Sequence, residues 1–387
     1  MDLQNLEDHV RTLVTLNETE DPLLSCYLNL DLGRASYRND LDLRVRVIRE
    51  ALPKQARRGF EEALGRIEAF LASEVLPETN GVALFSRAGA EPFFLSLQFR
   101  LPLPNHLGVD TVPNIYHLVE LKDTYHRYVL LISTETHARI VEVDVGNVTR
   151  ELWIAHPELR ERVGREWTKE HYQSHRRDRP AKFVKEKIQV LDRLVSDREH
   201  THLILAGSPK VVDRVRNALP KRLTEKVIDV VRMPGTATAE EAVLATLARY
   251  AEHEQEESLN TAALLLDELA RGGLAIHGTS ESLAALRRAQ VDVLVLSSAY
   301  EPPDGWACGS CDAADVGELP PACPCCGERK VRETNLREQL VRLAEMLGVK
   351  IEIVRESDVL FDIGGVGCLL RCRTSEQHNG EPEKQRR

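Results

Sequence analysis

The chain has 387 residues and a formal net charge of −10, with 42% hydrophobic and 29% charged residues. This length allows two or three domains, each with its own hydrophobic core, and the composition is typical of a soluble globular protein. No apolar run approaches the roughly 20 residues that cross a bilayer, so no membrane contact is expected. Residues 1–8 form neither a basic nor an apolar leader, and the cysteines lack a disulfide-like pattern. A cytoplasmic location is therefore expected.

The apolar pattern predicts an α/β fold made of three mixed α/β domains in tandem. The expected boundaries are 1–118, 119–258 and 259–373, with a disordered tail at 374–387.

In the first module, residues 25–30 and 81–86 are predicted strands, and a long helical pattern runs from Leu41 to Leu71 between them. The Leu-Pro-Leu-Pro-Asn stretch at 101–105 contains too much proline for an interior strand. We therefore expect it to lead out of this domain.

The second module begins with three predicted strands, and a glycine-containing turn at 145–147 joins the second to the third. The pattern then changes to alternating helices and strands, which predicts a mixed α/β domain. The expected elements are strands at 128–133, 138–143 and 148–153, a helix at 181–198, strands at 202–206 and 227–231, and an acidic helix ending near 257.

The third module is predicted to start with a helix from residue 260 to the Gly272-Gly273 pair, which can supply a left-handed cap. A βαβ unit follows, with Thr279 or Ser280 expected to cap its helix. The remaining predicted elements are strands at 274–277 and 291–297, a helix at 336–347 ending at Gly348, and strands at 349–354 and 366–371.

A positively charged stretch lies between the third strand and the next helix of the second module. From Arg160 to Lys187 the chain has ten Lys/Arg and five Asp/Glu. Positive charge concentrated on an acidic protein favours one site that faces a polyanion, and His, Tyr and Gln side chains suit unpaired RNA bases. A solvated helix face would have the same composition, and this alternative stays open. The residues expected to contact RNA are Arg165, Lys169, His171, Tyr172, Gln173, Ser174, His175, Arg176, Arg177, Arg179 and Lys182.

Four cysteines have the spacing of a metal site, with Cys308-x2-Cys311 and Cys323-x2-Cys326 separated by eleven residues. Such paired knuckles hold zinc tetrahedrally, and the intervening residues are too polar and too few to form a core without a metal. Four thiolates leave no ligand position for water. We therefore expect one structural zinc ion in a ribbon at 305–330, inserted between a strand and a helix, with four free cysteines as the alternative.

Histidines offer weaker metal candidates. His171 and His175 would lie on one face of a helix, but the surrounding positive charge opposes a cation. The remaining histidines in or beside strands show no metal-like spacing, namely His126, His137, His202 and His277.

The module order and several local sequences resemble the archaeal and eukaryotic class-I release factor and Pelota superfamily, in its diverged bacterial branch. In the third module, Gly272–Gly278, Ala289–Ser297 and Gly364–Gly367 are similar to the family's C-terminal domain, and the zinc insertion lies at the point found in archaeal factors. The resemblance implies an RNase-H-like second module. The first module is only loosely similar and lacks the family's stop-codon-reading motifs.

The resemblance places the family's Gly-Gly-Gln loop at His171-Tyr172-Gln173, so the glutamine is kept and both glycines are replaced. A residue with a Cβ costs about 1–2 kcal/mol in the left-handed conformation that glycine accepts. Peptide release also needs a water and the glutamine backbone held beside an ester without added bulk. Catalysis is therefore not expected; if the protein is an enzyme, Gln173 would position the water.

The resemblance thus implies a non-catalytic factor that binds the A site of the 70S ribosome, with its basic loop near the peptidyl transferase centre and contacts to 23S and 16S rRNA. The nearest functional analogue is the ribosome hibernation factor Balon. Elongation factor Tu or another translational GTPase is the expected partner of a chain that is monomeric when free. The alternative is a ribosome-rescue peptidyl-tRNA hydrolase or release factor that uses Gln173. A nuclease is disfavoured because several acidic residues follow the spacing of a solvated helix face, namely Glu240, Glu241, Glu254, Glu256 and Glu257.

Overall fold

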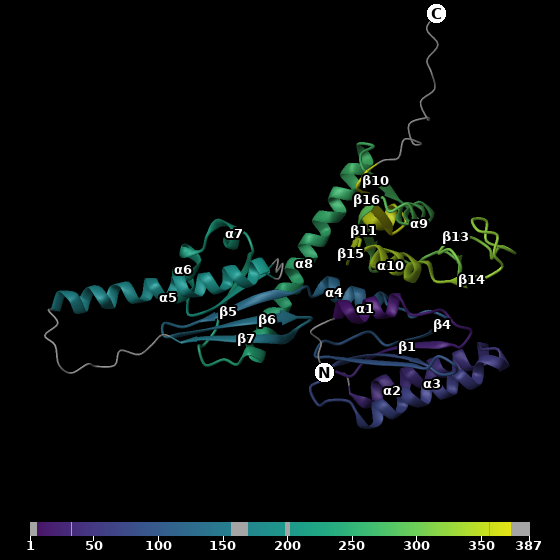
Figure 1. Cartoon of the computed structure of the whole chain (residues 1–387), viewed down its shortest axis with the longest axis horizontal. Coiled ribbons are helices and arrows are strands. Elements are labelled where there is room, and N and C mark those ends of the chain that lie inside the picture. Colours follow the sequence, from purple (N-terminus) through teal and green to yellow (C-terminus); the bar gives the residue numbers. More distant parts are fainter. Residues whose placement is uncertain (1–5, 32, 156–168, 198–201, 356, 373–387) are drawn as a thin grey trace, which may run out of the picture. The chain divides into compact units, whose positions relative to one another are not determined.

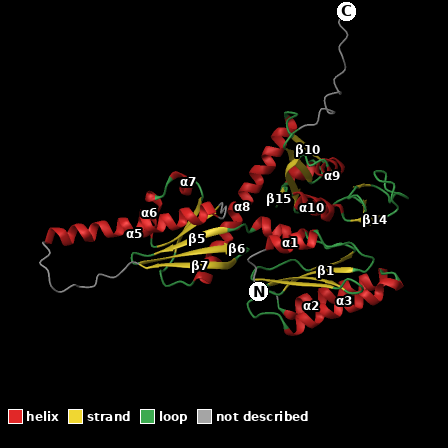
Figure 2. Cartoon of the chain, in the orientation of Figure 1, coloured by secondary structure: helices red, strands yellow, loops and turns green. Residues whose placement is uncertain are grey.

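The computed structural model describes most of the chain as helices and strands that alternate in mixed α/β arrangements (Figures 1 and 2). The described residues are 6–31, 33–155, 169–197, 202–355 and 357–372, with the side chains of 34–35, 147, 150, 153–155, 169–181 and 197 left outside the description. The predicted tail at 374–387 also lies outside the described residues. The expected α/β class with several sheets is confirmed.

Two compact units divide the chain. The first, here called the central unit, contains residues 125–254 and the short segment 99–101. The second, here called the terminal unit, combines residues 5–98 and 102–124 with residues 255–387. The expected first and third modules therefore contribute to one compact unit.

The N-terminal part of the terminal unit is a four-stranded sheet of order β3-β2-β1-β4, in which β1 is antiparallel to β2 and β4. Side chains of α2 and α3 form a buried cluster with β1 and β2. The elements are α1 (Leu6–Val14), β1 (Leu23–Asn29), α2 (Arg34–Ala51), α3 (Lys54–Ser73), β2 (Gly81–Arg87), β3 (Phe93–Phe99), β4 (His106–Asp110) and α4 (Tyr116–Thr124).

Two predictions for this part are wrong. The helical pattern at 41–71 is two helices, because Pro53 has no N–H to donate and restricts Leu52 to an extended conformation, with ψ at 137°. The proline-rich stretch 101–105 does not lead out of the domain. It precedes β4, which pairs with β1 in the same sheet, with Leu23 opposite Asp110.

The central unit contains a five-stranded sheet of order β7-β6-β5-β8-β9, in which β5, β8 and β9 are parallel and β6 is antiparallel to β5 and β7. The three successive strands predicted at its start are confirmed. The predicted turn is also confirmed: Val145 and Gly146 have φ of 47° and 70°, the left-handed pair that a two-residue hairpin requires. The elements are β5 (Tyr128–Ser133), β6 (His137–Asp144), β7 (Asn147–Ala155), α5 (Lys169–Asp197), β8 (His202–Gly207), α6 (Pro209–Ala218), α7 (Lys221–Thr224), β9 (Val227–Arg232) and the first part of α8 (Ala239–Ala270).

Helices cover both faces of this sheet. Because successive side chains of a strand point to opposite faces, Val129 and Leu131 pack in a core cluster with residues of α5 and α6. Tyr128 faces the other way and contacts α8, where its hydroxyl lies 3.0 Å from Thr246 Oγ1 and its ring stacks on Tyr250. The layer of α5, α6 and α7 and the layer of α8 therefore lie on opposite sides of the sheet.

Helix α8 corrects another prediction. The acidic helix expected to end near 257 and the helix expected to begin at 260 are one helix of 32 residues. Ser258-Leu259-Asn260 contains neither glycine nor proline, so nothing in the backbone stops the helix there. The predicted left-handed end is confirmed at Gly272, where φ is 60°.

The C-terminal part of the terminal unit has a sheet of order β10-β16-β11-β15, and β16 is antiparallel to both β10 and β11. The predicted βαβ unit is present with β16 inserted between its strands. The expected cap at Thr279 or Ser280 is wrong: Gly278 is the N-cap, and Thr279 Oγ1 instead bonds the Tyr300 hydroxyl at 2.7 Å. The elements are β10 (Ala275–His277), α9 (Thr279–Arg287), β11 (Val291–Ser297), β12 (Gly305–Cys308), β13 (Ala314–Val316), β14 (Val331–Thr334), α10 (Leu336–Leu347), β15 (Lys350–Val354), α11 (Asp358–Asp362) and β16 (Val366–Leu370).

Buried polar contacts join the two parts of the terminal unit. Glu338 Oε2, on α10, accepts hydrogen bonds from the backbone N–H groups of Ile115 and Tyr116 at 2.8 and 3.1 Å, which satisfies the start of α4. At the other end of α4, Asp123 Oδ2 accepts from the backbone N–H of Ile353 on β15 at 2.8 Å. Each of these bonds connects segments more than 200 residues apart in sequence.

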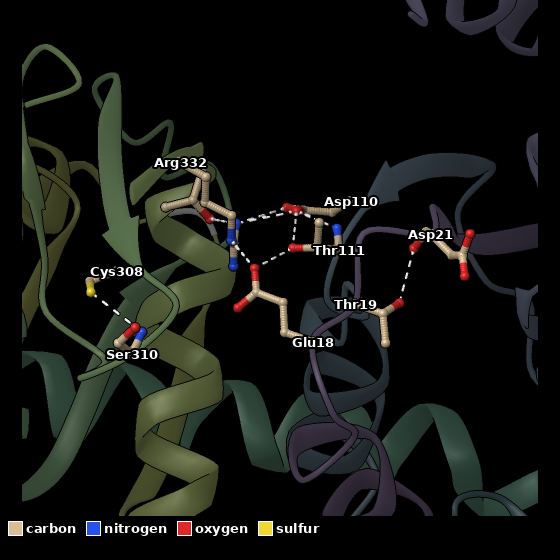
Figure 3. A network of polar contacts seen from close by, with 9 residues as sticks. Glu18, Thr19, Asp21, Asp110, Thr111, Cys308, Ser310 and Arg332 are labelled. Carbon is tan, nitrogen blue, oxygen red and sulfur yellow. Dashed lines mark hydrogen bonds and ion pairs between the residues drawn. The ribbon is translucent and has the colours of Figure 1, made fainter. Parts of the chain in front are cut away.

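A second junction uses Arg332 of β14 (Figure 3). Its guanidinium lies 2.8 Å from Glu18 and 3.2 Å from Asp110, and Thr111 donates to the same Glu18 carboxylate at 2.6 Å. The strand that carries Arg332 pairs with the cysteine-bearing β12, with Val331 opposite Cys308. The small three-stranded sheet is therefore tied to the N-terminal part by charge-assisted bonds.

Among the described residues, no helix combines the length and the apolarity needed to span a membrane.

Candidate metal centre and basic segment

The four predicted cysteines meet at one point. The Sγ atoms of Cys308 and Cys326 are 3.7 Å apart, those of Cys311 and Cys323 are 3.6 Å apart, and all four lie within 4.8 Å of one another. Tetrahedral zinc with Zn–S bonds near 2.3 Å places its sulfur ligands about 3.8 Å apart. The donor set and its spacing therefore fit a single tetrahedral ion, and the four cysteines can hold a metal.

Both halves of this centre have the same local geometry. The backbone N–H of Ser310 donates to Cys308 Sγ, and the N–H of Cys325 donates to Cys323 Sγ, each at 3.4 Å. Each knuckle then ends in a left-handed residue, with φ of 54° at Asp312 and 76° at Gly327. After this turn the first cysteine of each knuckle donates its backbone N–H to the residue five positions on, Cys308 to the Ala313 carbonyl at 2.7 Å and Cys323 to the Glu328 carbonyl at 2.8 Å. The left-handed conformation explains why glycine or an Asx-type residue stands at these positions.

The backbone N–H groups favour the thiolate form at one ligand. Donation from the Cys326 and Cys325 amides lowers the pKa of Cys323 to about 6, against the opposing effect of burial. A thiolate is the form that binds metal. The ribbon sheet β13-β12-β14 supports these knuckles, and a small cluster of Trp306 with Ala313 packs against Cys308 and Cys323.

The basic segment differs from its expected conformation. Residues 169–180, predicted as a loop, form the first turns of α5, which extends without interruption to Asp197. Arg165 lies outside the described residues, and the side chains of the other candidates up to Arg179 are likewise not described. Lys182 is exposed on the helix surface. His171-Tyr172-Gln173 therefore has a helical backbone, in which glycine is not required.

The structure also brings together residues that the sequence left apart. Nε2 atoms of His126 and His202 each lie 3.6 Å from a carboxylate oxygen of Glu254, whose side chain is only 6% exposed. The Tyr250 hydroxyl is 3.3 Å from His202 Nδ1. Glu254 was predicted on a solvated helix face, and that prediction is wrong.

A sequence signal for Glu254 existed. Val243, Leu247, Tyr250 and Glu254 follow one another at spacings of four, three and four residues, which places them on one face of a helix. The carboxylate thus continues an apolar stripe and needs positively charged or donating partners. His126 and His202, from distant parts of the sequence, come within 3.6 Å of its oxygens, which is ion-pair distance and longer than a hydrogen bond.

A protein-family model matches the central part of the chain. Residues 113–252 match the model of bacterial archaeo-eukaryotic release factor family 10. The resemblance to the release factor and Pelota superfamily is confirmed. The match includes α5 and its His171-Tyr172-Gln173 sequence, and it covers 140 of the 387 residues.

Solved structures of translation factors are also similar. The archaeal termination factor aRF1 is 16% identical, with 96% of this chain and 99% of that chain covered and a TM-score of 0.27. Pelota of Archaeoglobus fulgidus is 17% identical over 76% of this chain and 80% of its own, with a TM-score of 0.34. Archaeal Pelota, in a ribosome-bound complex with ABCE1, is 14% identical over 97% and 96% of the two chains, with a TM-score of 0.42. No curated protein matches the sequence.

Proposed function

We propose that this protein is a non-catalytic ribosome-binding translation factor that docks in the A site of the 70S particle, with the start of α5 near the peptidyl transferase centre. The family match of residues 113–252 carries this proposal. It supports a ribosome-associated role in translation for the central unit. Hibernation of idle ribosomes, as for Balon, is the specific role proposed, with elongation factor Tu or another translational GTPase as partner.

The helical backbone of α5 supports a binding role over catalysis. Peptide release in this superfamily depends on a Gly-Gly-Gln loop, and this chain has His171-Tyr172-Gln173 within a regular helix. In a helix the backbone N–H groups donate to carbonyls of the preceding turn, and the C=O groups accept from N–H groups of the following turn. Most of these backbone groups are therefore already hydrogen-bonded. They are then less available to hold a water beside an ester.

The metal centre has a structural part in this proposal. Its four sulfur ligands leave no open coordination position, and no catalytic role for the ion is proposed. Bound zinc would fix the ribbon and, through β14, the position of Arg332 against Glu18 and Asp110.

Co-sedimentation of the purified protein with vacant 70S ribosomes, across a salt series, tests the proposal. Wild type is expected to pellet with ribosomes at low salt, because Lys/Arg contacts to phosphates dominate such binding. The double variant Arg176→Glu with Arg177→Glu should bind at least about tenfold more weakly, since two attractive contacts become repulsive.

A matched control is the adjacent pair Arg287→Glu with Arg288→Glu, which makes the same charge change at the last residue of α9 and its C-cap, where both residues are exposed. This control should bind as wild type. Equal binding by the folded Arg176/Arg177 variant would remove the role assigned to the start of α5. Failure of wild type to bind at any salt, with or without a translational GTPase, would reject the proposed function.

The rescue hydrolase remains the second candidate, because Gln173 is kept from the family motif. Peptide release from stalled ribosomal complexes separates the two functions. Release by wild type that is lost in Gln173→Ala, while Gln189→Ala on the same helix retains it, would favour the hydrolase. The proposed binding factor predicts no release by any of the three proteins.

A further inference from the structure

The two helical layers of the central unit carry opposite charge. Residues 182–197 of α5, together with α6 and α7, contain nine Lys/Arg and four Asp/Glu. On the other side of the sheet, the part of α8 within this unit, residues 239–254, contains one Arg and four Glu. A solvated protein surface without a charged partner normally mixes both signs, so this separation calls for an explanation.

Several cations of the basic layer are unpaired. The side chains of Lys185, Arg193 and Arg216 are exposed and form no hydrogen bond or ion pair within the described part of the chain. Lys182 and Lys185 lie three residues apart on α5, and Arg193 follows eight residues after Lys185, so all three occupy its solvent side while its apolar residues enter the core.

Other cations of this layer have structural partners. Arg222 of α7 bonds Asp192 and Ser196 of α5 and so holds the two helices together. Lys187 is buried, and its ammonium donates to Ser133 Oγ at 2.7 Å and to the Thr134 carbonyl at 3.1 Å. Burial, reinforced by the nearby Arg214 guanidinium, lowers the pKa of Lys187 to about 8. Lys185, Arg193 and Arg216 therefore lie in a layer whose helices are held in place by other contacts.

We infer that the layer of α5, α6 and α7 is a second RNA-contacting surface, which binds the phosphate backbone of folded RNA through Lys185, Arg193 and Arg216. This inference deepens the proposed function and rests on it for the choice of ribosomal RNA as the ligand. The surface lies beyond the basic segment 165–182 considered above, and its side chains are described. It would extend contact along α5, whose residues 182–193 alone span about 16 Å.

The composition of the layer favours an RNA backbone over a protein partner. Among the described residues, none of the exposed large hydrophobic side chains lies on α5, α6 or α7, whereas Leu244 on α8 is 59% exposed. Protein interfaces are typically built around aromatic and apolar anchors. Among residues 182–197 of α5, α6 and α7, no described aromatic ring is exposed for unpaired bases to stack on. Cations without apolar or aromatic neighbours are suited to phosphates, which position a protein on RNA without reading its sequence.

A salt series on full-length protein tests this inference. The triple variant Lys185→Glu, Arg193→Glu and Arg216→Glu is compared with wild type for binding to vacant ribosomes and to protein-free 23S rRNA. If three phosphate contacts are lost, the slope of log K against log salt should fall by about 2 to 3, and binding at the lowest salt should weaken at least about tenfold. Circular dichroism checks that the variant is folded.

The matched control makes the same charge change in the terminal unit, at the exposed residues Arg271, Arg329 and Lys330, each replaced by Glu. Its slope should equal that of wild type. A milder triple variant, with Gln at positions 185, 193 and 216, guards against misfolding and should reduce the slope by a similar amount.

The outcomes separate the two proposals. An unchanged slope for both triple variants, while wild type binds ribosomes, overturns the second surface and leaves the proposed function standing. If wild type does not bind ribosomes, the proposed function fails, and binding to 23S rRNA decides the surface alone. If wild type binds 23S rRNA and the triple variants do not, the surface is supported. If the triple variants bind 23S rRNA as wild type does, or if wild type does not bind it, the surface is overturned.

Discussion

The central and terminal units use their charged residues differently. In the central unit, the cations of α5, α6 and α7 are mostly on the outside, where Lys185, Arg193 and Arg216 have no partner among the described residues. In the terminal unit, charged groups are used internally: Glu338 and Asp123 accept backbone N–H bonds, and Arg332 joins Glu18 and Asp110. The three unpaired cations of the central unit are available to a partner, whereas these charged groups of the terminal unit hold the fold together, as the buried Lys187 does in the central unit.

This difference follows from how each unit is assembled. The central unit forms from a nearly continuous stretch of chain, and its sheet, turns and helices close a core by local connections. The terminal unit joins the two ends of the chain, so its two sheets need contacts that bring together a particular pair of surfaces. The hydrogen bonds of buried carboxylates are strongly directional. If the two surfaces were packed in another way, buried polar groups would lose their partners, which costs free energy.

Removing two of the metal ligands should have the largest effect. The double variant Cys308→Ser with Cys326→Ser is expected to lose its bound metal ion and the hydrogen-exchange protection of residues 305–334, because the ribbon has too small a core to fold alone. Native mass spectrometry measures the metal. Cys325→Ser, the exposed fifth thiol, is the control and should keep one ion. Retained metal and protection in the double variant would contradict the centre described here.

Glu338→Ala should weaken the terminal unit next most strongly. The backbone N–H groups of Ile115 and Tyr116 would lose a buried acceptor, and each unsatisfied group costs about 1–3 kcal/mol. We expect the free energy of unfolding to fall by about 3 kcal/mol, measured by urea denaturation, with faster amide exchange at the start of α4. Glu301→Ala, at an exposed loop carboxylate, should have little effect. If Glu338→Ala lowers the free energy of unfolding no more than Glu301→Ala does, Glu338 does not join the two parts.

Glu338 should also make stability depend on pH. Burial raises the pKa of Glu338 above its ordinary value of 4.5, against the lowering effect of the two backbone donors. The folded state therefore binds a proton more readily than the unfolded state, so this group's contribution grows as pH falls through the raised pKa towards 4.5 and is lost as pH rises again.

The variant Glu338→Gln isolates this contribution. His106, whose pKa burial lowers to about 4, acts with the opposite sign between pH 4 and 6.5 in both proteins and cancels in the difference. Wild type should gain stability relative to Glu338→Gln as pH is lowered from 7 towards 4.5. A difference that is constant over this range would contradict the assignment.

The Arg332 junction should give the smallest effect. A double-mutant cycle with Arg332→Ala and Glu18→Ala is expected to yield a coupling energy of about 0.5–1 kcal/mol, because both side chains are partly exposed and screened by solvent (Figure 3). The exposed pair Arg58 and Glu62 on α3 supplies a reference cycle with weaker coupling. Equal coupling in the two cycles would mean that the junction contributes no more than a surface ion pair.

Much of the local structure was predictable, and the errors have identifiable causes. The strands β5, β6 and β7 and the turn at Val145 and Gly146 follow from alternation and from the position of a glycine. The break at Pro53 was missed because the apolar spacing of the two helices continues across it. The strand β4 was missed because proline precedes it without entering it, and α8 was divided because composition, and not a helix-stopping residue, suggested a boundary.

The sequence alone determined the features that depend on near neighbours: the α/β class, most strands and the four-cysteine set, whose members are at most 18 residues apart and whose turns are fixed by local backbone preference. The tertiary structure decided which polar side chains are buried and with what. Glu254 lies beside His126 and His202, and Glu338 accepts hydrogen bonds from the start of α4, because the groups around each buried carboxylate come from other segments of the chain. Those partners are set by which surfaces pack together, and no local pattern encodes that choice.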